Sequence, residues 1–416
     1  KPAFYAYRFA RCNRFMGRYL RHGEGYPDWS LRCFNRHHAQ WSADVVHEKV
    51  GFTGSAETLV GTLTGDLLHD SAESLENYLD KQNRYSTLAA NAALAQGKRA
   101  NAGLKRLTAE SGTHMVQFSP DGKRFLARWT NSTTPTQTRV QDAAGALLRT
   151  LDAPATEALS KLKLGKVSFQ TIQARDGHPL QTRLIFPPDF DPAKRYPVFQ
   201  EIYGGPGTPT VRDAFGRDLP WHHFLAQQGF VVWVCDNRSA SNRGTASGHH
   251  AYRRLGQTEL EDQLDGLAWL KAQGWADMNR VAIDGWSYGG FMSAYALTHS
   301  KAWKAGIVGA PVTDYRLYDS IYTERFMGLP KDNPEGYAAT RIMDKAKDVE
   351  GALLLFHGTL DDNVHPQNTI QLVDALQKAG KDFELVLLPG AGHGPRTPEQ
   401  VWFRYWKTWQ FLKKNL

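Results

Sequence analysis

The sequence predicts an α/β fold over residues 168–416, with a mostly parallel sheet covered by helices on both faces. Short apolar runs typical of buried strands alternate there with longer amphipathic segments typical of helices. Successive parallel strands need a connection that crosses the sheet, and helical connections of this kind cover both faces. Reactive side chains also follow directly after several of the apolar runs, and α/β proteins gather their chemistry at that end of their strands.

The elements of this domain can be placed in chain order by their patterns. Two strands, 167–174 and 180–186, come first and are joined by a turn at Asp176 and Gly177. The later expected strands span residues 198–203, 230–235, 305–308, 352–356 and 383–388, besides one that ends just before Ser287. The expected helices span residues 221–228, 259–273, parts of 319–346, 369–379 and 399–412, besides one that follows Ser287.

Two further regions precede this domain. Residues 1–101 are predicted to form a mainly helical or irregular segment, because apolar residues recur at helical spacing only between residues 66 and 95. Residues 102–167 predict a linker helix at 153–163 preceded by short strands and turns. Those strands are expected at residues 104–108, 113–118, 124–130, 138–140 and 146–149. The turn at residues 118–122 resembles one in a β-propeller blade, and at about 40–50 residues per blade the region holds about one blade.

Composition excludes several classes of protein. The net charge of +8 is spread along the chain, and no run of Lys and Arg is dense enough for nucleic-acid binding. No apolar run approaches the roughly 18–20 residues that a membrane span needs. The three cysteines, Cys12, Cys33 and Cys235, make no disulfide framework and no C-x-x-C motif. The chain opens on Lys1 without a signal-peptide pattern, which leaves its compartment open.

A G-x-S-x-G pattern at Gly285, Ser287 and Gly289 lies between an expected strand and an expected helix. A serine on such a turn is held in a strained backbone conformation with its hydroxyl exposed above the sheet. The flanking glycines are required because a Cβ atom would clash where strand and helix come so close. Ser287 is therefore the predicted nucleophile.

A candidate acid and a candidate base follow the last two expected strands. Asp361 comes after the first of them and His393 after the second. The chain order Ser…Asp…His is the order found in α/β-hydrolases. Because a serine hydroxyl is too weakly acidic to attack a carbonyl unaided, His393 is expected to take the proton of Ser287 while Asp361 orients the imidazole.

Neighbouring side chains leave alternatives open. Asp362 is a second candidate acid, and His357 and His365 are competing histidines, although His357 at a strand end is expected to be structural. Acyl transfer by this set of side chains requires no metal and no cofactor. His47 and Glu48 lack the second histidine of the zinc motif H-E-x-x-H, so no metal site is predicted there.

The oxyanion formed at a substrate carbonyl needs hydrogen-bond donors that are fixed in advance. The backbone N–H of Tyr288, directly after the nucleophile at the start of a helix, is one predicted donor. The other is expected from the loop after strand 198–203, where the phenol of Tyr203 stands before two glycines. The alternative for Tyr203 is a tyrosine that only fills the core at a strand end.

Residues 102–416 resemble the C-terminal half of the dipeptidyl peptidase IV branch of the prolyl oligopeptidase family. The matching stretches are residues 201–206, 255–259, 261–263, 285–290, 318–328 and 357–365. Residues 318–328 are the most specific of these, because the run Y-D-S-I-Y-T-E-R-F-M-G has no general structural reason to exist.

The resemblance implies a serine peptidase that acts on peptides with proline or alanine next to the cleaved bond. It makes Asp361 the triad acid and Tyr203 the side-chain oxyanion donor, and it implies that Asn363 contacts the substrate backbone. The side chains that it implies for the proline pocket are Tyr288, Val312, Tyr315, Tyr318, Tyr322 and Val364. An aromatic slot selects a proline ring by shape and leaves no donor unpaired. The family resemblance also implies a homodimer and a periplasmic location.

The chain departs from the family pattern in two places. No glycine follows Arg238, where the family pattern has one. No segment matches the propeller helix whose acidic residues hold the free N-terminus of the substrate in this family. We therefore expect the rest of the propeller to be missing and the activity to be impaired.

Residues 1–101 resemble a different family, the distal part of family 2 glycosyltransferases of lipopolysaccharide core assembly. The matching stretches are residues 21–32, 46–48, 65–69 and 81–90. The nucleotide-sugar half of those enzymes, with its Asp-x-Asp type motif, has no counterpart before Lys1, so no glycosyltransferase site is carried over. This segment and the absent signal pattern would favour the cytoplasm.

Three hypotheses follow for the function. The first is a serine peptidase that cleaves after proline through an acyl-enzyme. The second is a broader serine esterase or amidase, because the acyl-transfer groups alone do not name the leaving group. The third is an inactive fusion of glycosyltransferase and peptidase remnants, which the abrupt change of pattern near Asn101 favours.

Overall fold

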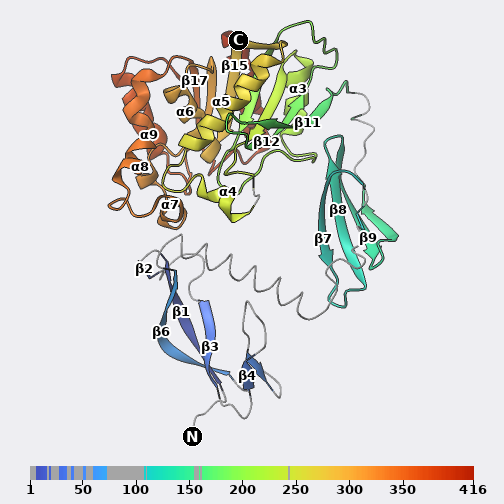
Figure 1. Ribbon diagram of the computed structural model, residues 1–416, viewed down its shortest axis with the longest axis vertical. Coiled ribbons are helices and arrows are strands. Elements are labelled where there is room, and N and C mark those ends of the chain that lie inside the picture. Colours follow the sequence, from blue (N-terminus) through green and yellow to red (C-terminus); the bar gives the residue numbers. More distant parts are fainter. Residues whose placement is uncertain are drawn as a thin grey trace. The chain divides into compact units, whose positions relative to one another are not determined.

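The structure is a computed structural model that describes residues 107–416, apart from residues 109, 154–158, 160–161 and 242–243, and strand backbones between residues 6 and 72. The chain divides into two compact units, Lys1–Lys105 and Arg106–Leu416. Figure 1 shows the elements of each unit.

The described part of the first unit consists of strands. They are β1 (Ala6–Phe15), β2 (Arg18–Tyr19), β3 (Asp28–Phe34), β4 (Ala39–Trp41), β5 (Val50–Phe52) and β6 (Val60–Ala72). β1 pairs antiparallel with β2 and β3 and parallel with β6, while β4 and β5 form a separate antiparallel pair. The region predicted as irregular therefore contains paired strands.

The helix predicted from residue 66 is wrong as far as residue 72. These residues continue β6, in which Leu67 and Leu68 pair with Arg11 and Cys12 of β1. Backbone pairing with a neighbouring strand depends on the tertiary context, and here it overrides the helical spacing of the apolar residues. Residues 73–95 of the predicted helix lie outside the described residues.

The second unit begins with a four-stranded antiparallel sheet in the order β10-β9-β8-β7. Its strands are β7 (Thr113–Phe118), β8 (Arg124–Asn131), β9 (Thr134–Asp142) and β10 (Leu147–Asp152). All four overlap strands predicted from the sequence. The strand predicted at residues 104–108 does not form at residues 107 and 108. Residues 104–106 and most of the predicted linker helix lie outside the described residues.

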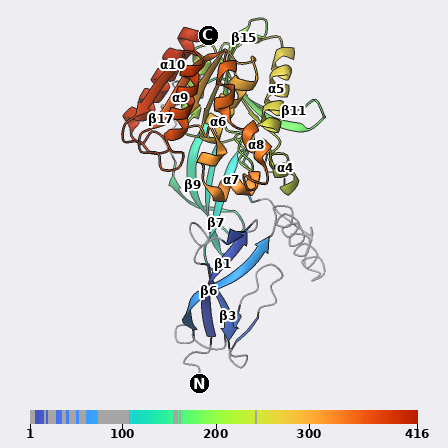
Figure 2. The same cartoon turned by 90° about the vertical axis from the view of Figure 1, so that its left-hand side faces the viewer.

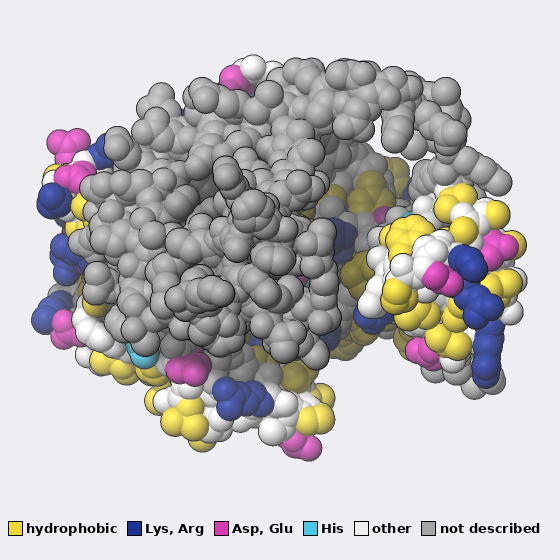
Figure 3. Space-filling view, turned by 90° about the horizontal axis from the view of Figure 1, so that it is seen from below, with side chains coloured by type: hydrophobic (Ala, Val, Ile, Leu, Met, Phe, Trp, Pro, Cys, Tyr) yellow, Lys and Arg dark blue, Asp and Glu magenta, His cyan; other side chains and the backbone are white. Residues whose placement is uncertain are grey.

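This small sheet leaves apolar side chains in contact with solvent. The large exposed ones are Met115, Val116, Phe118, Leu147, Leu148 and Leu151. Hydrophobic side chains are visible on its surface at the right of Figure 3. Ser132 donates from its backbone N–H to Asp213 Oδ1 at 2.8 Å, and Phe215 N–H donates to Thr130 Oγ1 at 3.0 Å, which ties the sheet to the following domain. That the sheet derives from a propeller blade stays a prediction.

The main sheet has eight strands in the order β11-β12-β14-β13-β15-β16-β17-β18. They are β11 (Val167–Gln173), β12 (Pro179–Ile185), β13 (Tyr196–Ile202), β14 (Val231–Asp236), β15 (Ala276–Trp286), β16 (Ala305–Gly309), β17 (Ala352–Gly358) and β18 (Glu384–Leu388). β12 pairs antiparallel with both its neighbours, and the six strands from β14 to β18 are parallel. This order confirms the predicted mostly parallel sheet.

Helices cover both faces of the main sheet (Figure 1, Figure 2). The α-helices are α3 (Leu219–Gln227), α4 (Thr245–His249), α5 (Gln257–Ala272), α6 (Tyr288–His299), α7 (Ser320–Met327), α8 (Pro334–Ala339), α9 (Gln367–Lys378) and α10 (Pro398–Asn415), with 3₁₀ turns η2 (Tyr315–Leu317) and η3 (Ile342–Asp348). No described helix combines the length and apolar composition that a membrane crossing needs. The predicted α/β-hydrolase fold is confirmed for this domain.

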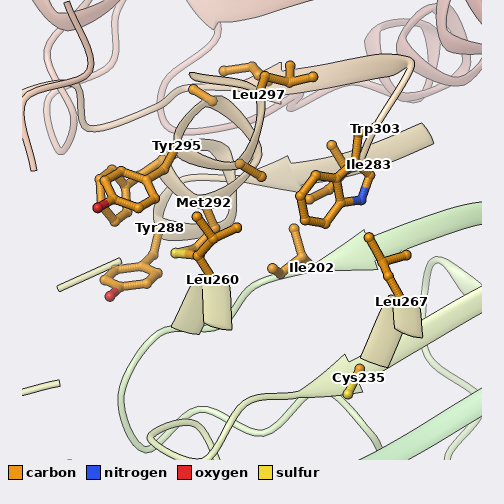
Figure 4. Close-up of a cluster of buried hydrophobic side chains, with 14 of the residues drawn as sticks. Ile202, Cys235, Leu260, Leu267, Ile283, Tyr288, Met292, Tyr295, Leu297 and Trp303 are labelled. Atoms are coloured by element: carbon orange, nitrogen blue, oxygen red, sulfur yellow. The ribbon is translucent and has the colours of Figure 1, made fainter. Parts of the chain in front are cut away.

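Two hydrophobic clusters lie on opposite faces of the sheet, because successive residues of a strand point to opposite sides. In β15, Ala282 belongs to the cluster that includes residues of α3 and α10, whereas Ile283 belongs to the cluster that includes residues of α5, α6 and α9. Figure 4 shows part of the second cluster, where Met292 and Leu297 of α6 lie near Ile202 and Ile283 of the sheet. The sheet is thus buried on both faces, and its strand ends carry the polar groups.

We expect Gly290→Ala to lower the stability of this domain. A Cβ atom on Gly290 would lie 2.2 Å from the backbone oxygen of Gly309 in β16, so α6 would have to move away from the sheet. The cost should be at least about 1–3 kcal/mol, measurable as a lower Tm. Gly216→Ala is the control, because its Cβ atom would meet nothing within 4 Å. Equal Tm values for wild type and Gly290→Ala would contradict the close approach.

Candidate active site

Ser287 occupies the turn between β15 and α6 in a conformation that non-glycine residues rarely adopt. Its φ is 61° and its ψ is −118°. The turn is held by a hydrogen bond from Ser287 N–H to Gly309 O at 2.8 Å and one from Phe291 N–H to Ser287 O at 2.9 Å. Strain of this kind persists only where the surroundings determine it, and it raises the hydroxyl above the strand ends.

The glycines of the motif permit this turn. A Cβ atom on Gly285 would lie 2.2 Å from Gly289 O, and one on Gly289 would lie 2.3 Å from Ile202 O. Backbone atoms therefore fill the space in which any other residue would place its side chain. The reason predicted for the G-x-S-x-G pattern agrees with this geometry.

The structure brings Ser287, His393 and Asp361 together in a line. His393 Nε2 lies 2.8 Å from Ser287 Oγ, and His393 Nδ1 lies 2.8 Å from Asp361 Oδ2. Because the carboxylate accepts from Nδ1–H, Nε2 is left as the acceptor of the serine proton. Ser287 and His393 are separated by more than a hundred residues, and only the parallel strand order places them side by side.

Asp361 is the acid of the neighbouring pair that reaches the histidine. It is buried, and its Oδ1 accepts the backbone N–H groups of Asn363 at 3.0 Å and Val364 at 2.9 Å. Burial by itself raises the pKa of this carboxyl, but hydrogen bonds from His357 and His393 outweigh it and hold the pKa below its ordinary value. The carboxylate therefore stays ionised at neutral pH.

The competing side chains take other positions. Asp362 and His365 are exposed, whereas His357 is fully buried at the end of β17. His357 Nε2 donates to Val364 O at 2.8 Å and lies 3.4 Å from Asp361 Oδ2, while Nδ1 accepts from Thr369 Oγ1 at 2.7 Å. His357 thus packs behind the acid and orients it, which fits the structural role expected from its strand-end position.

The two predicted oxyanion donors lie at neighbouring strand ends. Tyr288 is the first residue of α6, so its N–H has no acceptor inside the helix. Tyr203 directly follows β13, and its ring centroid lies 6.0 Å from that of Tyr288. Burial raises the pKa of the Tyr203 phenol, which keeps its O–H available as a donor. The side chain of Asn237 holds the following loop by donating to Gly204 O at 3.1 Å.

The side chains predicted for the proline pocket meet in one cluster. Tyr288, Val312, Tyr315 and Val364 are buried in it, and Tyr203, Tyr318 and Tyr322 pack against it with parts of their rings exposed. The ring centroids of Tyr318 and Tyr322 lie 5.6 Å apart, and the angle between the ring planes is 78°. Tyr318 Oη donates to Asn363 Oδ1 at 2.9 Å. The partly exposed members therefore offer an apolar, aromatic surface edged by one amide.

Trp286, which the sequence did not single out, connects the nucleophile turn to the histidine loop. Its indole N–H donates to His393 O at 2.7 Å. The guanidinium of Arg404 on α10 lies 5.0 Å from its ring centroid and hydrogen-bonds Asp284 at 3.2 Å. Burial raises the pKa of Asp284 to about 6 despite that arginine. The sequence feature that could have identified Trp286 is its position inside the G-x-S-x-G motif.

A cavity of about 440 Å³ adjoins the site, with Tyr203, Trp286 and His393 in its wall. Two buried donors in this region, Arg404 Nε and Trp221 Nε1, have no hydrogen-bond partner in the described part of the chain. No group of three or more His, Cys, Asp or Glu side chains suited to a metal ion occurs among the described residues.

Comparison with known proteins identifies a family domain. Residues 220–416 match the prolyl oligopeptidase family. The chain is 38% identical to mouse prolyl endopeptidase FAP over 272 residues, which are 64% of this chain and 34% of that protein. It is 36% identical to dipeptidyl peptidase 4 of Trichophyton equinum over 280 residues, 65% of this chain and 36% of that protein. The chain thus spans about a third of the length of these curated relatives.

Solved structures agree with this assignment. Dipeptidyl peptidase 4 of Porphyromonas gingivalis superposes with a TM-score of 0.73 at 33% identity, covering 76% of this chain and 45% of that one. A putative dipeptidyl aminopeptidase IV of Bacteroides ovatus gives a TM-score of 0.69 at 30% identity, covering 74% and 44%. The C-terminal part of this chain is therefore homologous to the C-terminal region of dipeptidyl peptidase 4.

We expect Trp286→Phe to slow the reaction of Ser287 with a fluorophosphonate probe about fivefold, the effect of losing one hydrogen bond worth about 1 kcal/mol. The phenyl ring can still pack under Arg404, but the bond to His393 O is lost. The second-order labelling rate is the measurement. Trp402→Phe, at an exposed tryptophan of α10, is the control and should label at the wild-type rate. Equal rates for Trp286→Phe and wild type would show that this bond does not position the base.

Proposed function

On the premise of a prolyl oligopeptidase family domain at residues 220–416, we propose that this chain is a serine peptidase that hydrolyses the peptide bond after proline. The observation that carries the proposal is the continuous hydrogen-bonded line from Ser287 Oγ through His393 to Asp361, with 2.8 Å at each step. A nucleophile, a base and an orienting acid in hydrogen-bond contact are the requirements of acyl transfer.

In the proposed mechanism Ser287 attacks the carbonyl carbon of the proline residue while His393 takes its proton. The negative charge that forms on the carbonyl oxygen is stabilised by Tyr288 N–H and the Tyr203 phenol. His393 then gives the proton to the leaving amine, and the acyl-enzyme remains on Ser287. Water then attacks the acyl carbon and gives a proton to His393. His393 returns that proton to Ser287 Oγ as the ester bond breaks and the acid leaves. Asp361 stays ionised throughout and stabilises the imidazolium.

The aromatic cluster supports proline as the residue before the cut. A proline ring is compact and apolar and has no N–H, so the faces of Tyr318 and Tyr322 can enclose it without an unmatched donor. In this proposal Asn363, which accepts a hydrogen bond from Tyr318 Oη, contacts the substrate backbone. The cavity beside Trp286 and His393 leaves room for the leaving part of the peptide.

Substrate class and oligomeric state extend this proposal. The printed names of the relatives, prolyl endopeptidase and dipeptidyl peptidase 4, support peptides with proline or alanine as substrates. A homodimer is supported by the exposed aromatic side chains Trp402 and Phe403 of α10, which line one pocket together with Leu387 of the edge strand β18. The glycosyltransferase resemblance of residues 1–101 and the domain boundaries near residues 101 and 167 stay predictions.

The alternatives are a broad esterase or amidase and an inactive chain. The hydrogen-bonded triad disfavours an inactive chain, because a remnant under no constraint has no reason to keep Ser287 strained and aligned. A broad esterase needs the same triad but gains nothing from an ordered aromatic cluster. Activity measurements separate the three.

Variants of the triad test the mechanism. Ser287→Ala and His393→Ala should each abolish fluorophosphonate labelling, and the double variant should be no worse, because the two groups act as a unit. Asp361→Asn should lower turnover by about 10⁴ with the fold intact. Asp362→Asn is the matched control at the exposed neighbour and should keep wild-type turnover. A larger loss at Asp362 than at Asp361 would overturn the assignment within the pair.

Substrate comparison tests the specificity. We expect kcat/KM for a Gly-Pro amide to exceed that for the matching Gly-Leu amide by about 10–200-fold, the range that shape selection in an apolar pocket gives. Tyr318→Ala should reduce this ratio more than it reduces the hydrolysis of a small ester. Rapid ester hydrolysis without any preference for Gly-Pro would favour the broad esterase, and the absence of all hydrolysis would favour the inactive chain.

A further inference from the structure

A buried carboxyl group that the mechanism does not use lies under the nucleophile turn. Glu259, in the first turn of α5, has no solvent exposure. Its Oε1 accepts the hydroxyl of Tyr288 at 2.9 Å, and its Oε2 has no hydrogen-bond partner among the described residues. An acidic side chain is costly to bury, so its presence here needs a reason.

The start of α5 is pressed against α6 at this point. Gly256, which precedes α5 with a φ of 88°, would place a Cβ atom 2.8 Å from the Phe291 ring and 3.3 Å from the Tyr295 ring. Figure 4 shows Tyr288 and Tyr295 on the side of α6 that faces Leu260 of α5. The contact between Glu259 and Tyr288 therefore joins two helices that pack closely.

Tyr288 is one peptide bond from the nucleophile, and its backbone N–H is a proposed oxyanion donor. Its ring centroid lies 5.4 Å from that of Phe291 and 6.3 Å from that of Tyr315, and its hydroxyl donates to Glu259. A side chain held at both ends leaves the first turn of α6 little freedom. Oxyanion donors are effective only when they are fixed before charge develops.

We propose that Glu259 is a positioning residue of the active site, which holds Tyr288 through its hydroxyl and so keeps the Tyr288 N–H aimed at the substrate oxyanion. This inference rests on the proposed function. Glu259 acts through Tyr288 and touches neither the substrate nor the reacting atoms.

The surroundings of Glu259 make this bond sensitive to pH. The groups that face it are Asp262 on its own helix, Tyr288 and Tyr295 on α6, Tyr315 on η2 and Tyr322 on α7. Burial raises the pKa of Glu259 from 4.5 to about 7, and the hydrogen bond from Tyr288 lowers it only in part. The hydrogen bond is strongest to the ionised carboxylate, so it strengthens as pH rises through about 7.

Activity and stability should respond to this ionisation with opposite signs. The activity should depend on an ionisation near pH 7, with the ionised Glu259 as the active form. Stability should move the other way. Because the folded pKa lies above the unfolded one, the favourable contribution of the protonated form is complete below pH 4.5 and is lost as pH rises to about 7. Glu259→Gln should remove both dependences.

The experiment compares kcat and KM for a Gly-Pro amide between pH 5 and 9 in four proteins. They are wild type, Glu259→Gln, Tyr288→Phe and the control Glu261→Gln, which changes an exposed acid of the same helix. We expect Glu259→Gln to lower kcat about tenfold at pH 8, the effect of a charge-assisted hydrogen bond, with KM little changed. Its pH profile of kcat should lose the ionisation near pH 7, and Glu261→Gln should match wild type.

Tyr288→Phe keeps the inference testable if Glu259→Gln does not fold. It removes the same bond from the other side and should reproduce the loss in kcat, and the double variant should be no worse than either single variant. An active wild type whose kcat and pH profile are unchanged in Glu259→Gln would overturn the role of Glu259 alone. A loss confined to KM would also overturn it. A wild type without activity would overturn the proposed function together with this inference.

Discussion

The close approach of α6 to the ends of β13 and β16 is the constraint on which the rest of this site depends. Gly289 and Gly290 place backbone against backbone there, at distances that exclude any Cβ atom. The turn into α6 then has only the strained conformation of Ser287 open to it. One packing contact thereby orients the nucleophile hydroxyl, frees the first N–H of α6 and sets the place that His393 must reach.

Two buried carboxylates near this turn, Asp361 and Asp284, are each matched by specific partners. Asp361 stays ionised because two backbone N–H groups and two histidines surround it. Asp284 is matched by Arg404, which also lies over the indole of Trp286. Since an unmatched charge in such a place would cost several kcal/mol, these pairs fix side chains more firmly than apolar packing alone. The base is held from two sides, at its ring and at its carbonyl.

Much of the fold could be predicted from the sequence because the deciding signals are local. The apolar runs of the main sheet, the glycines of the elbow and the polar residues after each strand all lie within a few positions of one another. The prediction failed where pairing with a distant segment determines the secondary structure. Apolar residues at 66–72 have helical spacing, yet these residues form a strand beside β1. Trp286, Arg404 and Glu259 were missed for the same reason, because their partners lie far away in the chain.

By itself, the sequence determined the order of strands and helices, the strained serine turn and the small set of side chains from which a triad could be built. Only the tertiary structure decided which of those side chains meet. It selected Asp361 over the exposed Asp362, and it placed His357 behind the acid and His393 in front. It also buried Glu259 under Tyr288. The physical reason is that burial and hydrogen-bond distance depend on how strands and helices pack, and residue patterns along the chain carry no record of distances across it.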